Sequence, residues 1–404
     1  MRSPRAVSYI LAIIAISCTL VLFSQPAQLA WQRIFGGEDF MGGTFEDIPA
    51  RVVNAKDGGY VISGMNRGQD EDSPRGMYVA KLDKAGKALW MKYPAVDSNY
   101  HANPTLFTPT ADGGFLFGGR KYFSIGMTKI DGNGEVVWDR KYELDNVKNI
   151  LFIVETKDGT ITSMLYGRGG NKPVLMKLDK NGRVLSFKRL ANDIDGFQVG
   201  SVSYTREGFF ILAGTKYNNG YNTINTYIQD LRLMKLDAEG TVLWDRGYGG
   251  LKQDFGRRAS GTADGGFVAA GCSSSFNNRN EWDFYIVRVD SHGNRQWEKY
   301  YGGADTNYIS SCHETQDGGY ICGGTRIRKA GSQYMLVKLD GRGNRVWEKF
   351  YGAGKLNLMM NDFSIAGDGG FICIGQLENA PAQRIDNYAV KTDDKRNSGS
   401  FPSR

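Results

Sequence analysis

The sequence predicts an all-β fold: a seven-bladed β-propeller with four antiparallel strands in each blade. Three observations lead to this prediction. Gly makes up 53 of the 404 residues and aromatic residues 12% of the chain, a composition typical of short strands joined by tight turns. Two turn motifs recur at regular intervals along the chain. Finally, the repeat region begins with an unmatched strand and ends with a missing one.

The first turn motif is Asp-Gly-Gly. Intact copies begin at Asp57, Asp112, Asp264, Asp317 and Asp368, and degenerate copies begin at Asp158 and Glu207. Gly supplies the positive φ angle that tight hairpin turns require, so each copy is expected to join two antiparallel strands. Residues 313–315, for example, should pair with residues 320–322 across the turn that contains Asp317.

The second turn motif is Lys-x-Asp-x-x-Gly-x-x-x-Trp, as in Lys81 to Trp90. Later copies end in Trp138, Trp244, Trp297 and Trp347, a degenerate copy has Ser186 in place of Trp with Phe187 beside it, and a final copy stops after Asp393. The flanking runs are rich in β-branched and aromatic residues, so this motif predicts a second hairpin in every repeat. Two hairpins in each of seven repeats are typical of a β-propeller.

The two ends of the repeat region complement each other. Residues 31–37 match the fourth strand of later repeats, at 244–250 and 297–303, although no complete repeat precedes them. The last repeat stops at Asp393, before its own fourth strand. We therefore expect the N-terminal strand to complete the last blade as its outer strand, which also covers an edge that would otherwise promote aggregation.

The complete repeat, Asp-Gly-Gly-Tyr…Gly…Lys-Leu-Asp-x-x-Gly-x-x-x-Trp, resembles the repeats of exported bacterial and archaeal β-propellers of the delta-60 and quinoprotein-like type. The resemblance covers about residues 31–393. It implies a propeller fold but no single activity, because the resembling proteins include scaffolds, binding proteins and enzymes. The hallmark residues of Asp-box sialidases are not matched.

Residues 1–30 are predicted to direct export, as a signal peptide or a signal anchor. Two Arg lie within residues 1–5, and residues 6–23 carry no charge. Three interpretations remain open: cleavage after Ala30, retention of residues 6–23 as a membrane anchor, or a lipoprotein modified at Cys18. In each case residues 31–393 are exported, to a periplasmic, cell-surface or secreted location. Residues 394–404 form a polar tail.

The expected strand order, from the channel outwards, places the two kinds of repetitive turn on one face and the more variable loops on the other. We call these the turn face and the loop face. Binding residues are expected in the loops, because loops on a rigid scaffold usually carry function. Residues 215–230 and 273–283 supply the candidate binding residues Tyr217, Tyr221, Tyr227, Phe276, Arg279 and Trp282. Alternatively, these aromatic side chains fold back as lids on their own blades.

Two recurring residues of the second motif have a structural interpretation. The cation that begins each copy (Lys81, Lys129, Lys177, Lys235, Arg288, Lys338 and Lys391) either forms an ion pair within its own hairpin or belongs to a ring that attracts an anion. We favour the ion pair, because a residue present in every blade is normally needed by the blade. The recurring Trp is expected to pack between blades or over the outer edge.

The sequence indicates a non-enzymatic binding or scaffold module of the cell envelope, with an envelope or extracellular protein or a glycan as partner. It contains no Gly-x-Ser-x-Gly, His-Glu-x-x-His or phosphate-loop motif, and its three His residues fall in different repeats. These features indicate no catalytic residue, no metal site and no cofactor. A net charge of +7 without charged runs gives no indication of nucleic-acid binding. Membrane contact is expected only through an uncleaved N-terminal segment.

The alternative function is a propeller enzyme, either a polysaccharide hydrolase or lyase or a quinone-dependent dehydrogenase. Its carboxylates would lie at the channel mouth. The candidates are Asp47, Asp254, Asp305 and Asp362, each placed just before an expected inner strand. Asp is also favoured at such positions because it caps an incoming strand, and this structural role is the interpretation we prefer.

Four cysteines lie in the part of the chain expected to be exported: Cys272, Cys312, Cys322 and Cys373. In an oxidising compartment they could form disulfides. A three-residue turn at residues 316–318 would place Cys312 opposite Cys322, so a cross-strand disulfide between these two is one interpretation. Four buried free thiols are the other.

Overall fold

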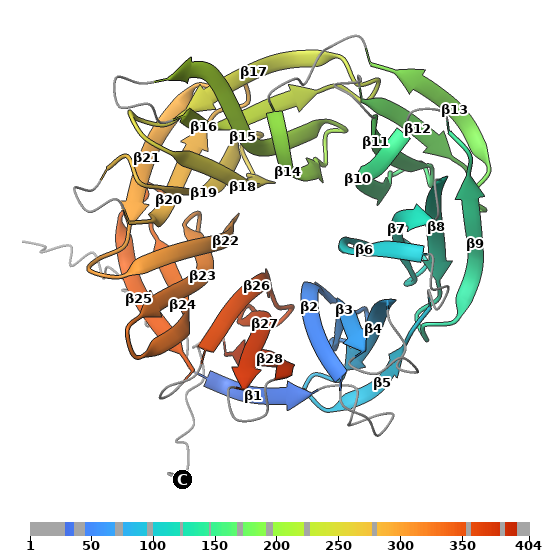
Figure 1. Ribbon diagram of the computed structural model, residues 1–404, viewed down its shortest axis with the longest axis horizontal. Helices are drawn as coiled ribbons and strands as arrows, with labels where there is room; N and C mark the ends of the chain where they lie inside the picture. Colours follow the sequence, from blue (N-terminus) through green and yellow to red (C-terminus); the bar gives the residue numbers. More distant parts are fainter. Residues whose placement is uncertain are drawn as a thin grey trace, which may run out of the picture.

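The computed structural model describes residues 29–35, 45–68, 76–94, 100–121, 124–144, 147–167, 173–190, 197–221, 227–276, 281–352, 357–379 and 384–393. Within these ranges the regular structure consists of 28 strands in seven antiparallel sheets of four. The sheets are arranged as blades around a central axis (Figure 1). The predicted seven-bladed β-propeller is therefore confirmed. Among the residues described, no helix has the length and apolar character needed to cross a membrane.

Each blade runs from an inner strand at the channel to an outer strand at the rim, as predicted. Blade 1 contains β2 (Phe45–Asn54), β3 (Tyr60–Gly68), β4 (Gly76–Leu82) and β5 (Ala88–Lys92). Blade 2 contains β6 (Tyr100–Pro109), β7 (Phe115–Lys121), β8 (Ser124–Ile130) and β9 (Val136–Tyr142). Blade 3 contains β10 (Val147–Glu155), β11 (Ile161–Gly167), β12 (Val174–Leu178) and β13 (Val184–Arg189). Blades 4 and 5 contain β14 (Phe197–Tyr204), β15 (Phe210–Tyr221), β16 (Tyr227–Leu236) and β17 (Val242–Tyr248), then β18 (Asp254–Gly261), β19 (Phe267–Ser273), β20 (Asp283–Val289) and β21 (Arg295–Tyr301). Blade 6 contains β22 (Thr306–Glu314), β23 (Tyr320–Arg328), β24 (Gly331–Leu339) and β25 (Arg345–Tyr351), and blade 7 contains β26 (Asn357–Ile365), β27 (Phe371–Asn379), β28 (Arg384–Thr392) and β1 (Leu29–Phe35).

The ring closes through the N-terminal strand. β1 pairs antiparallel with β28 and forms the outer strand of blade 7 (Figure 1). Side-chain hydrogen bonds also join the inner strands of blades 7 and 1. The backbone N–H of Val52 donates to Asp362 Oδ2 at 3.1 Å, and Asn54 Nδ2 donates to the carbonyl of Ile365 at 2.8 Å. The predicted closure is thus confirmed.

The Asp-Gly-Gly turns have the geometry that their sequence requires. In blade 6 the N–H of Thr315 donates to the carbonyl of Gly319 at 2.9 Å, and Gly318 has a φ of 75°. The carboxylate of Asp317 accepts the N–H of Gly319 at 3.1 Å, which closes the turn from its side chain. A left-handed φ at Gly318 explains why this position is Gly in all seven repeats.

The recurring Trp joins one blade to the next. The ring of Trp244 in blade 4 lies 5.9 Å from the ring of Phe267 in blade 5, measured between centroids. Its indole N–H donates to the carbonyl of Ser291 in the outer turn of blade 5, at 2.9 Å. Because Trp244 is only 8% exposed, it is a core residue of the interface between the blades.

The recurring cation forms an ion pair in five of the seven blades. The pairs join each cation to the Asp of its own Asp-Gly-Gly turn: Lys81–Asp57, Lys129–Asp112, Arg288–Asp264, Lys338–Asp317 and Lys391–Asp368, with N–O distances of 2.5 to 2.8 Å. These cations are therefore neutralised within their hairpins and do not form a ring that is free to attract an anion. Blades 3 and 4 depart from this pattern.

Candidate functional site

On the loop face, the described candidate residues of blade 5 pack against their own blade. Phe276 stacks on Tyr300 with 3.7 Å between ring centroids, and its side chain remains 43% exposed. Trp282 packs on Phe255 at 4.7 Å and is partly buried. Arg279 lies outside the described residues. Phe276 is thus the described aromatic of this group that still offers an exposed ring.

The three candidate tyrosines of blade 4 lie in strands, so the prediction of a loop over residues 215–230 is wrong for residues 215–221 and 227–230. β15 continues to Tyr221 and β16 begins at Tyr227, with Tyr217 paired to Gln229 and Tyr221 paired to Tyr227. Tyr and Thr favour extended backbone. Pairing between β15 and β16 therefore continues into the segment that the sequence suggested was a loop. The side chains of these tyrosines lie outside the described part of the structure.

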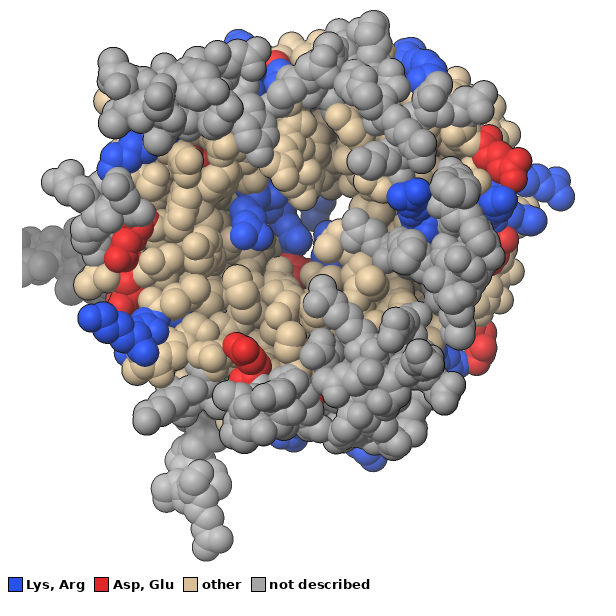
Figure 2. Space-filling view, in the orientation of Figure 1, with Lys and Arg blue, Asp and Glu red and all other residues tan. Residues whose placement is uncertain are grey.

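At the centre of the ring, charged groups from three blades meet. Asp362 of β26 accepts a hydrogen bond from Arg258 of β18, and its Oδ2 lies 3.5 Å from Nε of Arg51 on β2. Burial and the neighbouring Arg258 lower the pKa of Arg51. Arg257, the bulged residue of β18 that precedes Arg258, is exposed. Lys and Arg side chains gather around the central opening (Figure 2). This group of Arg51, Arg258 and Asp362, which we call the channel cluster, has more positive than negative charge.

The candidate catalytic carboxylates have structural partners where the structure describes them. The sequence predicted that Asp362 lies just before its strand, but it lies inside β26, where it binds Arg51 and Arg258. Asp305 forms an ion pair with Arg326 at 2.6 Å. Asp254 is fully buried, which raises its pKa, and it accepts the N–H of Gly250 at 2.7 Å. The side chain of Asp47 lies outside the described residues.

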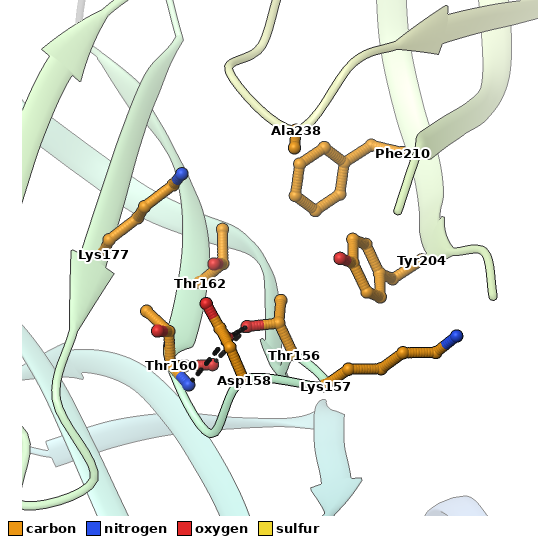
Figure 3. A pocket seen from close by; sticks show the side chains of 9 residues that line it. All are labelled: Thr156, Lys157, Asp158, Thr160, Thr162, Lys177, Tyr204, Phe210 and Ala238. Atoms are coloured by element: carbon orange, nitrogen blue, oxygen red, sulfur yellow. Dashed lines mark hydrogen bonds between the residues drawn. The ribbon is translucent and has the colours of Figure 1, made fainter. Parts of the chain in front are cut away.

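A cavity of about 260 Å³ lies between blades 3 and 4 on the turn face, where the sequence predicted no site. It is lined by Asp158, Thr160, Thr162 and Lys177 of blade 3 and by Tyr204, Phe210 and Ala238 of blade 4. The rings of Tyr204 and Phe210 face the polar side chains of blade 3 (Figure 3). We call this space the blade 3–4 cavity.

A missing glycine explains the position of Lys177 in this cavity. In blade 6, a Cβ added to Gly319 would lie 2.5 Å from Nζ of Lys338, so this Gly makes room for the cation beside Asp317. Blade 3 has Thr160 at the same position. The ammonium of Lys177 turns instead to Glu239 of blade 4, at 3.0 Å.

Blade 4 supports the same explanation. Phe209 occupies the position of the glycine, and Nζ of Lys235 lies 4.1 Å from the centre of its ring and donates to the carbonyl of Ser291 at 3.3 Å. Among the described residues, Lys235 forms no ion pair with a turn carboxylate. In both blades, therefore, a side chain in place of Gly redirects the cation.

The missing Trp of the degenerate repeat leaves the cavity open. Thr162, Lys177 and Ser186 are cross-strand neighbours on β11, β12 and β13. In the other repeats the third of these positions is the Trp, which is the cross-strand neighbour of the cation. Without it, the side chain of Lys177 is 29% exposed, against 7% for Lys338. The degenerate motif at Ser186 was visible in the sequence, and it was the available signal for this cavity.

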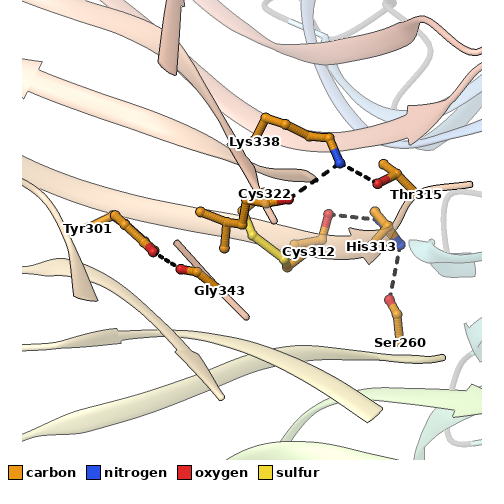
Figure 4. Close-up of a disulfide and its surroundings, with 10 residues drawn as sticks. Ser260, Tyr301, Cys312, His313, Thr315, Cys322, Lys338 and Gly343 are labelled. Atoms are coloured by element: carbon orange, nitrogen blue, oxygen red, sulfur yellow. Dashed lines mark hydrogen bonds between the residues drawn. A yellow bond between two sulfur atoms is a disulfide. The ribbon is translucent and has the colours of Figure 1, made fainter. Parts of the chain in front are cut away.

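The structure contains a disulfide between Cys312 and Cys322 in blade 6, with 4.0 Å between the Cα atoms (Figure 4). The two residues face each other in the register that the turn predicts. Cys272 and Cys373 are buried free thiols.

His313, next to the disulfide, lies 3.0 Å from Ser260 Oγ through Nδ1, and burial lowers its pKa to about 4. This histidine is therefore neutral at physiological pH. Within the described residues, no three His, Cys, Asp or Glu side chains are grouped so that they could hold a metal ion.

No protein-family model matches the chain, and no curated protein sequence matches it. Solved structures do share its fold. An ulvan lyase of polysaccharide lyase family PL25 aligns with a TM-score of 0.54 at 11% identity, covering 89% of this chain and 96% of the lyase. Sqt1 from Chaetomium thermophilum aligns with a TM-score of 0.52 at 8% identity, covering 91% and 99% of the two chains. At these identities the likeness shows the fold alone, and the chain is a seven-bladed β-propeller.

Proposed function

We propose that this protein is an exported, non-enzymatic binding module of the cell envelope. It engages a protein or glycan partner at the loop face and within the central channel. The observation that carries this proposal is the channel cluster. Arg51 and Arg258 share the single carboxylate of Asp362, and Arg257, the residue before Arg258 on β18, is exposed. A partner that brings an acidic group to the channel would neutralise the excess positive charge of these arginines.

The solved structures with this fold are compatible with either binding or catalysis. One of them is BBS1N in a complex with ARL6DN, with a TM-score of 0.50 at 8% identity, covering 92% of this chain and 98% of that chain. Another is the ulvan lyase. We favour binding because the three described carboxylate candidates, Asp254, Asp305 and Asp362, already have structural partners. The hydrolase, lyase or dehydrogenase alternative would require a carboxylate that these contacts leave available.

The exposed Arg257 provides the test. The full chain, immobilised, is used to capture partners from an envelope extract, and the retained species are identified and quantified. Arg257→Ala should reduce retention of the main partner by at least about fivefold, which corresponds to about 1 kcal/mol of binding free energy. Arg206→Ala, which removes an exposed arginine from a turn on the other face, is the matched control. Equal retention by the wild type and both variants, with unchanged thermal melting, would contradict the proposal.

The location has a separate test. If the signal is cleaved as proposed, N-terminal sequencing of the mature protein should find a start near Trp31, just inside β1. A mature chain that retains residues 6–23 would support the anchor instead, and would place the outer strand of blade 7 near the membrane. Recovery of the intact chain in the cytosolic fraction would contradict export.

A further inference from the structure

We propose that the blade 3–4 cavity is a binding site for an indole ring, supplied by a tryptophan side chain of a partner polypeptide. The cavity lies on the turn face, so this site is independent of the proposed function at the loop face. The inference rests on the six other crevices between blades, each of which contains a tryptophan of this chain at the corresponding position: Trp31, Trp90, Trp138, Trp244, Trp297 and Trp347. Those six crevices define the chemistry that the seventh can accept.

The aromatic wall of the site is present. In four of the other crevices, those of Trp31, Trp244, Trp297 and Trp347, the tryptophan ring contacts an aromatic residue at the start of the second strand of the next blade. The ring centroids are 5.9 Å apart for Trp244 and Phe267 and 5.3 Å apart for Trp297 and Tyr320. The equivalent residue of blade 4 is Phe210, which begins β15 and lines the cavity. An indole entering the cavity would therefore meet the same kind of ring.

The hydrogen-bond acceptor of the site is also present. The indole N–H of Trp138 donates to the carbonyl of Lys180 at 3.0 Å, and that of Trp244 to the carbonyl of Ser291 at 2.9 Å. Both acceptors follow the Asp of the outer turn in the next blade. In blade 4 this residue is Ala238, which lines the cavity and whose carbonyl accepts no hydrogen bond from the described residues. A bound indole can donate to this carbonyl.

The size and charge of the cavity fit the same ligand. Its volume of about 260 Å³ exceeds the roughly 150 Å³ in which a protein cavity holds benzene. At the outer end Leu190 contacts Gly240, whereas the equivalent Gly293 contacts the ring of Trp244. The open space, and a ring bound in it, therefore lies farther in, towards Lys177. The ammonium of Lys177 can lie beside an aromatic face, as that of Lys92 does at 5.6 Å from the centre of the Trp90 ring.

The chain has no tryptophan of its own left for this position. It contains seven Trp residues. Six belong to the other crevices, and Trp282 packs on Phe255 in blade 5. A second copy of the chain holds its tryptophans in the same places. The occupant must therefore come from another molecule. Because the indole in each of the other six crevices is a side chain of a polypeptide, we infer that this one is too.

The test uses the full chain and two probes, N-acetyl-tryptophanamide and a short tryptophan-containing peptide. We expect both to bind saturably, with a Kd on the order of 1 mM for the amide, as expected for a single side chain. N-acetyl-leucinamide should bind at least tenfold more weakly. Ser186→Trp should abolish binding of both probes because the chain's own indole then occupies the crevice, whereas Ser186→Ala should leave the Kd within twofold. Binding of N-acetyl-tryptophanamide but not of the peptide would overturn the assignment to a polypeptide partner.

A second variant protects the test against misfolding of Ser186→Trp. Phe210→Leu removes the aromatic wall while keeping an apolar side chain, and should weaken both probes at least fivefold. Absence of saturable binding by the wild type, or equal binding by wild type, Ser186→Trp and Phe210→Leu, would overturn the proposal. Capture through the loop face should be unchanged in these variants, so failure of one proposal is distinguishable from failure of the other.

Discussion

The crevice after blade 5 and the crevice after blade 3 are built from the same positions and differ in what fills them. Blade 5 has Gly266, Val268, Arg288, Trp297 and Tyr301 where blade 3 has Thr160, Thr162, Lys177, Ser186 and Leu190. In blade 5 the cation binds its own turn and the indole reaches the next blade, donating to the carbonyl of Gly341 at 3.2 Å. In blade 3 the cation reaches the next blade instead and a cavity remains.

This difference shows that one repeat can lose its inter-blade side chains without loss of the fold. The four strands of blade 3 keep their order and register. What blade 3 loses is apolar contact at the rim, where the outer strand β13 is exposed along its whole length. A repeat that tolerates such a loss becomes the place where a new surface can form, and this is the physical basis of the site proposed there.

The largest expected effect comes from making an intact crevice resemble the open one. Trp244→Ser removes an 8% exposed indole and its hydrogen bond to Ser291. We expect a loss of about 3–5 kcal/mol in the free energy of unfolding, measured by urea denaturation. Leu243→Ser, at the neighbouring residue that is 49% exposed, is the control and should change little. A loss below about 1 kcal/mol for Trp244→Ser would mean that the crevices are not held by their indoles.

A second substitution tests the role of the glycine. In Gly319→Thr the new Cβ would lie 2.3 Å from the carbonyl oxygen of Leu339 and 2.5 Å from Nζ of Lys338, so both must move. We expect a loss of about 1–3 kcal/mol, as for other overpacked sites, with the ion pair to Asp317 broken. Gly303→Thr, at a site with no neighbour within 4 Å, is the control. Equal stability of both variants would remove the explanation for the position of Lys177.

The reverse substitution should stabilise the protein. Ser186→Trp fills the crevice between blades 3 and 4. The new indole can contact Phe210, as Trp244 contacts Phe267 in the next crevice. We expect a gain of about 0.5–2 kcal/mol, the usual range for a filled cavity, seen as a higher melting temperature. Ser186→Ala should melt as the wild type does. A lower melting temperature for Ser186→Trp would show that blade 3 has adapted its backbone to the smaller residue.

The smallest effect concerns the pH dependence of an intact ion pair. Partial burial alone would raise the pKa of Asp112, but Lys129, the hydroxyl of Thr110 and the N–H of Gly114 lower it to about 2. Because the folded-state pKa lies below the unfolded value of about 3.9, this carboxylate stabilises the fold above pH 4 and loses that effect as the pH falls towards 2.

Asp112→Asn should therefore reduce the loss of stability on acidification between pH 4 and pH 2. We expect a difference below about 1 kcal/mol, because the side chain of Asp112 is 58% exposed and its charge is screened by solvent. Urea denaturation at several pH values measures it. In blade 3 the pKa of Asp158 is lowered by Thr156 and the N–H of Thr160 and not by a lysine, so Asp158→Asn should have a smaller effect. The opposite order would contradict the comparison of the two blades.

The sequence by itself determined the number of blades, the order of their strands, the closure by β1 and the register of Cys312 and Cys322. These features follow from local signals, since Asp-Gly-Gly and the Asp-x-x-Gly turn define each hairpin and their spacing defines each blade. For the hairpin of residues 210–236, the sequence predicts too long a loop. Pairing between β15 and β16 continues as far as Tyr221 and Tyr227, beyond the point where the turn residues suggested that the strands end.

Only the tertiary structure decided where the charges and the cavity lie. Arg51, Arg258 and Asp362 belong to three different blades and meet because the inner strands converge on one axis. Likewise, the departure from the motif at Ser186 is visible in the sequence, but the cavity exists only because Phe210 and Ala238 of the next blade face Thr162 and Lys177 across it. Turn residues act on their immediate neighbours, whereas a site between blades depends on how two separately formed sheets pack, and no single repeat contains that information.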